Sequence, residues 1–554
     1  MPTSEYIPEQ KSLGVYVPAH TDPSHHPQPA AINVPAAAGL LQCRVTYGRL
    51  YSYHSLPQSM PQALLGSMKE LGIDHTRCYD RINRFSLYGL GFPREDSNLD
   101  IELHGDKEGL QNINFKSHRD ASWNDVQDDC IRMNQKTLST LPRTAFVLRT
   151  YHDFDYTPHQ ILVLRAIMNE LSLRTSGQIT LHFLIHVRDS SIPIFASEAI
   201  YNQTLASALP TEFAGMGTLW TVPQMRSIYP GPFEETVNFS GSDLYDAYRS
   251  LHFPLQHWTV QHPEFDFIWQ WEMDIRVTGH YGELIDKITA WADRQADEYL
   301  WERNAQFFIP SLHGNSYAAF AEATAAQAAS EGRQSIPGPQ LNTSDLLRVP
   351  DQPASSTAVG VITDLITLNP IFDPNNTRWA FHDDVTGYGP VRPPTRAALI
   401  TASRFSRRLL LLMHEETHRK RHTMFPEMFP ASIAYQYGLR AIYAPITTYL
   451  DRDWDPVHAD EVFNNARISE NSKSKGMQEH GGGKFHGEGG SIFGPGEHPF
   501  RSSTWYSNAG FAGYLWRRWL GNENGNGEVD WELGEGNGRM CLPMMVLHPV
   551  KSDV

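Results

Sequence analysis

The sequence lacks the features that mark nucleic-acid-binding, membrane-spanning and secreted proteins. Its 554 residues carry 46 Lys and Arg against 62 Asp and Glu, and no basic block relieves the net charge of -16. We therefore expect no nucleic-acid partner, because a phosphate backbone would be repelled. Apolar runs such as Leu409–Met413 stop far short of the roughly 18 to 20 residues that a membrane span needs. The N-terminus has no basic start followed by an apolar core, so neither a secretory leader nor a membrane anchor is expected.

Cysteine is scarce, and its spacing matches no familiar pattern. Cys43, Cys78, Cys130 and Cys541 are far apart and form no CxxC or zinc-ribbon motif. We expect free thiols in a reducing compartment, with a disulfide pair as the alternative that no spacing supports. The expected location is therefore the cytoplasm, with the Golgi lumen as the alternative if an N-terminal anchor has been lost. The GxGxxG fingerprint is absent as well, which excludes the ordinary dinucleotide-binding motif.

The composition, with 40% hydrophobic, 11% aromatic and 19% charged residues, is typical of a folded protein long enough for more than one domain. A Pro-, Ala- and His-rich beginning without periodicity predicts a disordered or wrapping arm, and a Gly-rich run predicts either a disordered insertion or a lid over substrate. The expected parts are an arm (1–40), an irregular cap (41–142), an α/β nucleotide-binding half (143–310), a helix plus linker (311–358), and an acceptor-side half (359–554) with the Gly-rich loop 476–496.

The α/β half begins with a strand, a helix and a second strand in close succession. The apolar run Thr144–Tyr151 predicts a buried strand, Thr157 precedes a helix that starts at Pro158, and Ile179–Val187 predicts the next strand. Connections this short predict a right-handed parallel unit, whose ligand crevice lies at the carboxyl ends of its strands. Arg149 and Asp153 end the first strand and are therefore expected in that crevice. Outside this unit, helices are expected over 283–309 and over Arg396–Arg421.

A third strand of this half runs directly into two carboxylates. Aromatic residues alternate from Phe265 to Trp271, and the same period of two places Glu272 and Asp274 on one face. Two acids on one face repel each other unless a cation lies between them, and a hard divalent cation is the usual occupant. The sequence therefore predicts a divalent metal at Glu272 and Asp274. The alternative is a surface strand with two solvated acids, which its aromatic content disfavours.

A competing metal motif lies further along the chain. His414-Glu415-Glu416-Thr417-His418 matches HExxH, which on a helix places two histidines one turn apart to bind zinc, with Glu415 as general base. The longer form of the motif, with a Gly and a third His, is not present, so His422 or Glu427 would have to complete the site. The alternative is an ordinary polar helix end that runs through Arg419–Arg421.

Several longer stretches resemble a known family. The chain from about residue 45 to 551 resembles a fungal family catalogued as domain of unknown function 3405. This resemblance implies a GT-A-like Rossmann-type mixed sheet flanked by helices, and a glycosyltransferase in which an acid-x-acid motif holds a divalent metal against a nucleotide-sugar. The stretches that carry it are Cys78–Arg81 with Tyr88-Gly89, Trp271–Arg276 with Gly279-His280, His422–Pro430, Glu497-His498 with Trp505-Tyr506, and Arg539–Pro543.

The resemblance and the residues together predict a metal-dependent transfer of a sugar from a nucleotide-sugar donor to a hydroxyl acceptor. Mn²⁺ or Mg²⁺ is the expected metal, on Asp274 and Glu272, with His498 as third ligand and His548 as the alternative. The donor is expected to contact Arg149, Asp153, Glu272 and Asp274. Arg276 or Arg149 is expected to neutralise the leaving diphosphate, and Glu427 to act as base toward the acceptor. A zinc hydrolase using His414, Glu415 and His418, and a non-catalytic nucleotide-sugar-binding module, remain the alternatives.

Overall fold

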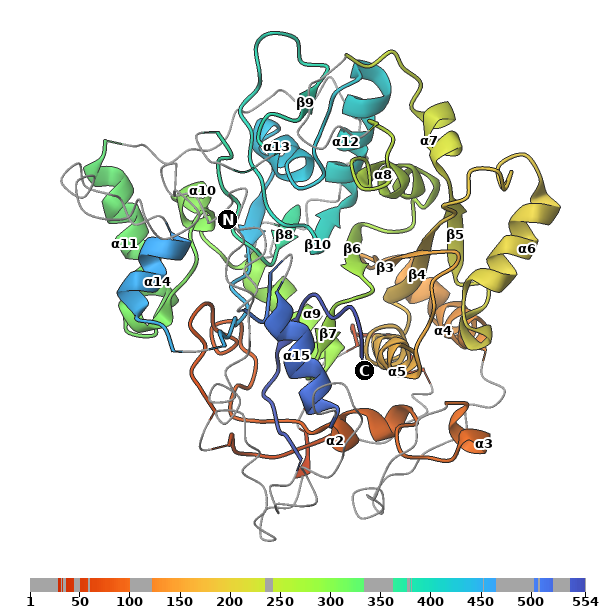
Figure 1. The fold of residues 1–554 in the computed structure, drawn as a ribbon, viewed down its shortest axis with the longest axis horizontal. Helices are drawn as coiled ribbons and strands as arrows, with labels where there is room; N and C mark the ends of the chain where they lie inside the picture. The colour runs from red at the N-terminus through yellow and green to blue at the C-terminus, as the bar shows by residue number, and fades with distance from the viewer. Residues whose placement is uncertain are drawn as a thin grey trace.

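A seven-stranded mixed sheet lies at the centre of the molecule, with helices around it (Figure 1). The mixed α/β class expected from the sequence is therefore confirmed. The predicted Gly-rich loop 476–496 and the predicted ligand His498 lie outside the residues that this computed structural model describes. Those are residues 28–30, 32, 36–43, 50–57, 60–99, 122–234, 243–332, 362–375, 379, 381–451, 453–464, 503–506, 509–521 and 539–553.

The order of the strands across the sheet is β12-β8-β10-β6-β3-β4-β5. Parallel pairs join β3 to β4 and β6, β4 to β5, and β8 to β12, whereas β10 runs antiparallel to both β6 and β8. The sheet thus also includes strands from beyond the expected linker 311–358. The strands are β3 (Thr144–Tyr151), β4 (Ile179–His186), β5 (Gly217–Trp220), β6 (Phe267–Glu272), β8 (Leu365–Thr367), β10 (Ala402–Ser406) and β12 (Ala441–Tyr443).

The first strand and helix follow the sequence prediction closely. β3 spans the predicted residues, and its centre is buried because the strand has a neighbour on each side. Helix α5 (Pro158–Ile167) starts where the N-cap pattern placed it. Thr157 Oγ1 accepts the backbone N–H of Gln160 at 3.2 Å, and Gln160 Oε1 accepts that of Thr157 at 2.9 Å. This reciprocal capping satisfies two donors that the first turn leaves free.

The strand order reverses between β3 and β6. From β3 the chain adds β4 and then β5 on one side, and β6 returns to the opposite side of β3. In an open parallel sheet, such a reversal opens a crevice at the carboxyl ends of the two strands that flank it, and ligands bind there. The ends of β3 and β6 carry Arg149 and Glu272, which are partners in the strand register.

The C-terminal segment is attached to the far end of β6. After a turn at 273–275, β7 (Arg276–Val277) pairs antiparallel with β13 (Val546–Leu547). Arg276 is buried and forms an ion pair with Asp553 at 3.0 Å. The indole N–H of Trp516, on α15 (Gly510–Trp519), donates to the same carboxylate at 2.8 Å. The C-terminus therefore lies beside α15 and the start of α5 (Figure 1).

Two predicted helices were wrong in extent. The region 283–309 forms two helices, α9 (Tyr281–Asp293) and α10 (Leu300–Asn304), because buried Arg440 donates to the carbonyl oxygen of Ala292 at 2.9 Å and so satisfies the end of α9. The region 396–421 is strand β10 followed by α12 (Arg407–Lys420). Ser406 Oγ accepts the N–H of Leu409 at 3.2 Å and caps α12, so the preceding residues join the sheet instead.

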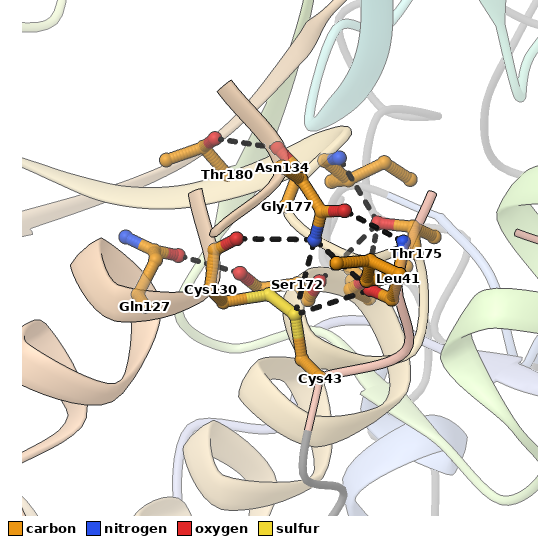
Figure 2. Close-up of a disulfide and its surroundings, with 11 residues drawn as sticks. Leu41, Cys43, Gln127, Cys130, Asn134, Ser172, Thr175, Gly177 and Thr180 are labelled. Carbon is orange, nitrogen blue, oxygen red and sulfur yellow. Dashed lines mark hydrogen bonds between the residues drawn. A yellow bond between two sulfur atoms is a disulfide. The ribbon is translucent and has the colours of Figure 1, made fainter. Parts of the chain in front are cut away.

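The prediction of free thiols was also wrong, because all four cysteines form disulfides. Cys43 pairs with Cys130 on α4 (Trp123–Leu138), and Cys78 pairs with Cys541. Figure 2 shows the first bond, beside which Asn134 accepts the N–H of Leu41 at 2.7 Å and donates to its carbonyl at 2.9 Å. The two cysteines of the first disulfide are 87 positions apart in sequence, and those of the second are 463 positions apart. No local spacing pattern indicates such pairs.

The remaining elements surround this framework. No helix in the described part of the chain is long and apolar enough to cross a membrane. The further elements are β1 (Gln28–Pro29), β2 (Tyr51–Ser52), α2 (Arg81–Phe85), α3 (Arg94–Ser97), α6 (Glu198–Ala208), α7 (Val222–Ile228), α8 (His252–Gln261), α11 (Tyr317–Ser330), β9 (Val385–Thr386), β11 (Thr423–Met424), α13 (Phe429–Gln436) and α14 (Pro456–Phe463).

Candidate metal centre

Two carboxylates stand where β6 ends, as the alternation of the strand predicted. Glu272 is the last residue of β6, and Asp274 follows in the turn that the N–H of Ile275 closes onto the carbonyl of Glu272 at 3.3 Å. Their side chains and that of His548 form a group whose ligand atoms all lie within 4.8 Å of one another. It is the group of three such side chains found among the described residues, and it lies at the carboxyl end of β6, where the strand order reverses.

His548 reaches the acids because the pairing of β7 with β13 ends one residue before it. Its Nε2 lies 3.4 Å from Glu272 Oε2 and 3.5 Å from Asp274 Oδ1. Its Nδ1 lies 3.0 Å from the carbonyl oxygen of Tyr506. Since a carbonyl oxygen only accepts, Nδ1 carries the hydrogen and Nε2 is held toward the carboxylates. A metal-binding histidine is typically oriented by such a bond from its other nitrogen.

The charges of the three side chains are strongly coupled. Burial disfavours the charged imidazolium of His548, but hydrogen bonds and charge from Asp274 and Glu272 outweigh it and raise the pKa of His548 to about 9. Burial also disfavours the ionised carboxyl of Asp274, yet His548 and Lys551 hold its pKa well below the usual range. The centre therefore favours negative charge on the acids and positive charge between them.

Two further cations flank the acids. Arg149 on β3 forms an ion pair with Glu272 Oε1, and the ammonium of Lys551 forms one with Asp274 Oδ2. Each carboxylate thus has one oxygen on a cationic side chain and the other facing His548. Lys551 is held in place because the N–H of Val550 donates to the carbonyl oxygen of Asp274 at 2.8 Å, while its own side chain is 78% exposed.

Glu427 approaches the same centre from the segment between β11 and α13. Burial, together with the negative charge of Glu272, raises the pKa of Glu427 to about 8. Glu427 as a whole is half-buried. Its Oε2 atom, however, is shielded from solvent and accepts no hydrogen bond from any described residue. A carboxyl whose pKa lies near neutrality and which has a free oxygen is suited to exchange a proton with a bound ligand.

The donor set fits a divalent cation. Two carboxylates offer oxygen ligands, and the imidazole of His548 offers a nitrogen ligand once a cation displaces the proton from its Nε2; Mn²⁺ and Mg²⁺ favour carboxylate oxygens. Three protein ligands would leave positions for oxygens of a diphosphate and for water. The bond from His548 Nδ1 to the carbonyl oxygen of Tyr506 is compatible with this assignment, because it leaves Nε2 directed at the acids.

Not every residue predicted for the site lies in this group. Asp153 lies beyond β3 at the same edge of the sheet but faces Arg188, at the end of β4, which donates to it at 3.0 Å. Arg276 faces away from the acids, contrary to expectation: its side chain is 1% exposed and holds Asp553. His548, the alternative third ligand, does lie at the predicted pair. Arg149 pairs with Glu272 as described above.

The HExxH residues lie on α12, one turn apart as predicted. The rings of His414 and His418 are stacked with their centroids 5.3 Å apart, and His414 Nδ1 lies 2.9 Å from the hydroxyl of Tyr229. Within the described ranges, no third His, Cys, Asp or Glu completes a metal-binding group with them. His422 Nδ1 lies 2.6 Å from Glu416 Oε2, and the charge of Glu272 acts on Glu427. Both residues expected to complete a zinc site are therefore directed elsewhere.

The sequence analysis missed two side chains at this centre. Lys551 stands three residues after His548 but belongs to no motif, and only the bond from Val550 to Asp274 brings it to the acids. Tyr248 lies in the polar stretch 243–250, which has no periodic pattern. Its ring packs against Phe425, two residues before Glu427, at a centroid distance of 5.7 Å, and burial together with the charges of Glu427 and Glu272 raises the pKa of its hydroxyl.

Comparison with known proteins identifies a family but no characterised relative. The model of a family described as "Protein of unknown function (DUF3405)" matches residues 134–552. That range contains β3, β6, the acid pair, Glu427 and His548. No curated protein and no solved structure matches the chain.

Proposed function

The chain belongs to the family described as protein of unknown function (DUF3405), and from its candidate metal centre we propose that it is a metal-dependent glycosyltransferase of the GT-A type. It transfers a sugar from a nucleotide-sugar donor to a hydroxyl group of an acceptor. One observation carries the proposal: Glu272, Asp274 and His548 converge at the carboxyl end of β6, where the strand order reverses.

The position of the centre supports a nucleotide ligand. The crevice between β3 and β6 is the place where doubly wound sheets bind nucleotides, and here it is lined by cations as well as by metal ligands. Arg149 and Lys551 both lie within ion-pairing distance of the acids. A diphosphate bound beside these acids would meet two positive side chains, which could take the place of the GxGxxG fingerprint that this sequence lacks.

The chemical difficulty of sugar transfer is the charge that develops on the leaving diphosphate. When bound at Glu272, Asp274 and His548, Mn²⁺ or Mg²⁺ supplies positive charge and Lewis acidity for those phosphate oxygens. Arg149 and Lys551 add fixed positive charge on either side of the acids. Glu427 accepts the proton of the attacking hydroxyl, a role that suits its free oxygen and its raised pKa.

The disulfides bear on where this reaction takes place. Cys43–Cys130 and Cys78–Cys541 would be reduced in most cytosolic environments, whereas secretory compartments maintain such bonds. We therefore favour the Golgi lumen, the alternative of the sequence analysis, over the cytoplasm. Mass spectrometry of the protein from its native source, alkylated before reduction, checks this point: free thiols at all four positions would return the assignment to a reducing compartment.

A panel of nucleotide-sugars, with and without Mn²⁺, tests the proposed function. We expect one donor to raise the melting temperature only when metal is present, because a ligand that binds the native state alone stabilises it by mass action. The same donor should release its nucleoside diphosphate in a turnover assay. Donor binding without turnover would instead support the non-catalytic binding module.

The control variant is Asp129→Asn, which removes an exposed acid on α4 that pairs with Arg132 at 2.6 Å. It changes the protein's charge by the same amount as Asp274→Asn but lies outside the centre. Equal metal-dependent shifts in wild type, Asp129→Asn and Asp274→Asn would contradict the proposal, since the shift would then not depend on the acid pair.

A further inference from the structure

An exposed aromatic ring stands beside the metal centre. Tyr248 is 58% exposed and is thus one of the large hydrophobic side chains that the described part of the chain leaves open to solvent. It lies in the segment 243–250, before α8. Exposed aromatic rings close to a catalytic centre are common points of ligand contact, because they offer a large apolar face at a small cost in conformational entropy.

The ring is held rigidly. Arg249, the next residue, is buried, forms an ion pair with Asp384 at 2.6 Å, and donates to the carbonyl oxygen of Met424 at 2.8 Å. Tyr248 itself packs edge-on against Phe425 with a centroid distance of 5.7 Å. Phe425 in turn stacks on Phe381 at 3.8 Å. The open part of the Tyr248 ring is therefore fixed before any ligand arrives.

The same contacts place the ring next to Glu427. Phe425, which supports Tyr248, precedes Glu427 by two residues. Burial together with the charges of Glu427 and Glu272 raises the pKa of the Tyr248 hydroxyl above its ordinary value. Glu427 has one carboxylate oxygen without a partner among the described residues. An apolar face and a free hydrogen-bond acceptor thus lie side by side.

We propose that the acceptor is a carbohydrate, and that one of its sugar rings stacks on Tyr248 and presents a hydroxyl group to Glu427. This inference rests on the proposed function. A pyranose ring has C–H groups on its faces, which pack on an aromatic ring, and hydroxyls around its edge, which donate to carboxylates. An anionic acceptor fits poorly, because Glu427 must itself become ionised to accept a proton, the negative charge of Glu272 acts on it, and the whole chain carries a net charge of -16.

The transfer balances with these groups alone. The acceptor hydroxyl oxygen forms a bond to the anomeric carbon of the donor sugar, and the bond from that carbon to the diphosphate oxygen breaks. The diphosphate leaves with the electron pair of that bond, and the hydroxyl proton passes to Glu427. Tyr248 takes no part in bond making. It positions the acceptor, so its removal should act on acceptor binding.

The test compares Tyr248→Ala with Tyr248→Phe, using methyl glycosides of glucose, galactose, mannose and N-acetylglucosamine as acceptor probes. Loss of the ring should raise the KM of the preferred saccharide by about tenfold, the effect of losing a stacking contact with its buried area. Tyr248→Phe should stay within about threefold of wild type, since the ring remains. The matched control is Asp129→Asn on α4, which should leave the saccharide KM, the donor KM and the slow transfer of the sugar to water unchanged.

The outcomes separate this inference from the proposed function. Absence of metal-dependent transfer to water in wild type contradicts the proposed function, and direct binding of the methyl glycosides, measured by saturation-transfer NMR, then tests the inference alone. An unchanged saccharide KM or unchanged saccharide binding in Tyr248→Ala overturns it. So does a preference for a nucleoside, a peptide hydroxyl or a polyprenol over every saccharide.

Discussion

The molecule holds two candidate metal sites, and they differ in how their residues are brought together. His414 and His418 are one helical turn apart on α12, and their motif is complete in five residues of sequence. The acid centre joins Glu272 and Asp274 to His548, which lies more than 250 positions later. The local motif has no third ligand among the described residues, whereas the long-range centre has three.

The side chains around the two sites also differ: those around the acid centre come from distant parts of the chain, whereas Glu415 of the helical motif pairs with a residue of its own helix. Around the acid centre, His548 is oriented by the carbonyl of Tyr506, and two cations balance the carboxylates. Around the helical pair, Glu415 forms an ion pair with Arg419 at 3.2 Å on the surface of the same helix. A motif therefore supplies ligand spacing, but the packing around it decides whether those ligands meet others. The following predictions test that contrast, from the largest expected effect to the smallest.

Asp274→Asn should reduce sugar transfer by about three orders of magnitude, since a bound metal stabilises charge in the transition state by several kcal/mol. His414→Ala should leave transfer within about twofold of wild type, as a substitution outside the site does. Donor turnover at fixed Mn²⁺ and the melting temperature of both variants measure this. Raising Mn²⁺ should partly restore donor binding in Asp274→Asn. Normal turnover in Asp274→Asn would contradict the assignment of the acid centre. If His414→Ala lost both its activity and its bound zinc, the functional metal site would be the HExxH pair instead.

Glu427→Gln separates the two sites in another way, because Glu427 was also a possible zinc ligand for the HExxH pair. If it is the base of the transferase, kcat should fall by about 100-fold while Mn²⁺ affinity stays unchanged. Glu427→Asp, which keeps the carboxylate, should recover part of the rate. Calorimetric titration with Mn²⁺ and initial-rate kinetics give the two quantities. Loss of retained zinc from the protein would place Glu427 with the histidines instead.

His548→Ala should weaken Mn²⁺ binding by about tenfold or more, since even the loss of an outer-shell partner of a metal ligand has an effect of that size. The matched control is His418→Ala, which removes an exposed imidazole from the other site and should leave Mn²⁺ affinity unaltered. Electron paramagnetic resonance of free Mn²⁺ gives both dissociation constants. Equal affinities in the two variants would remove His548 from the centre.

Lys551→Met should have the smallest effect of these variants. It should raise the affinity for Mn²⁺ and lower the affinity for a nucleoside diphosphate. Without the ammonium at Asp274, Mn²⁺ should bind about three- to fivefold more tightly, which corresponds to an exposed ion pair of about 1 kcal/mol. A nucleoside diphosphate should bind more weakly, because one cation of the crevice is gone. Lys551→Arg keeps the charge and should resemble wild type. A fall in both affinities would show that Lys551 only supports the local fold.

Several features of the fold were predictable from short stretches. The apolar run at Thr144–Tyr151 gave the bounds of β3, and the capping pair Thr157 and Gln160 gave the start of α5. The two acids do lie close together, although β6 ends at Glu272 and Asp274 reaches its place through the turn that follows, not through strand alternation. The predictions of β3 and α5 succeeded because each depends on neighbours in sequence, through side-chain period or a cap.

Other predictions failed where distant residues decide the local structure. Ala402–Ser406 lies within the region Arg396–Arg421 that was predicted to be helical. In the structure it is a strand that pairs with β6 on one side and β8 on the other. At the end of helix α9, Arg440, nearly 150 positions away, donates to the carbonyl oxygen of Ala292. The cysteines form disulfides because the fold places the Cα atoms of each pair 5.4 to 5.5 Å apart. Their spacing along the chain does not reveal this proximity.

The sequence by itself determined the α/β character of the central unit and the acid pair at the end of β6, because both follow from residues a few positions apart. Only the tertiary structure decided which residues complete the centre. The pairing of β7 with β13 brings His548 and Lys551 to Asp274, while the ion pair of Arg276 with Asp553 turns a neighbouring cation away. These contacts cross most of the chain, and only packing of the whole sheet brings them together.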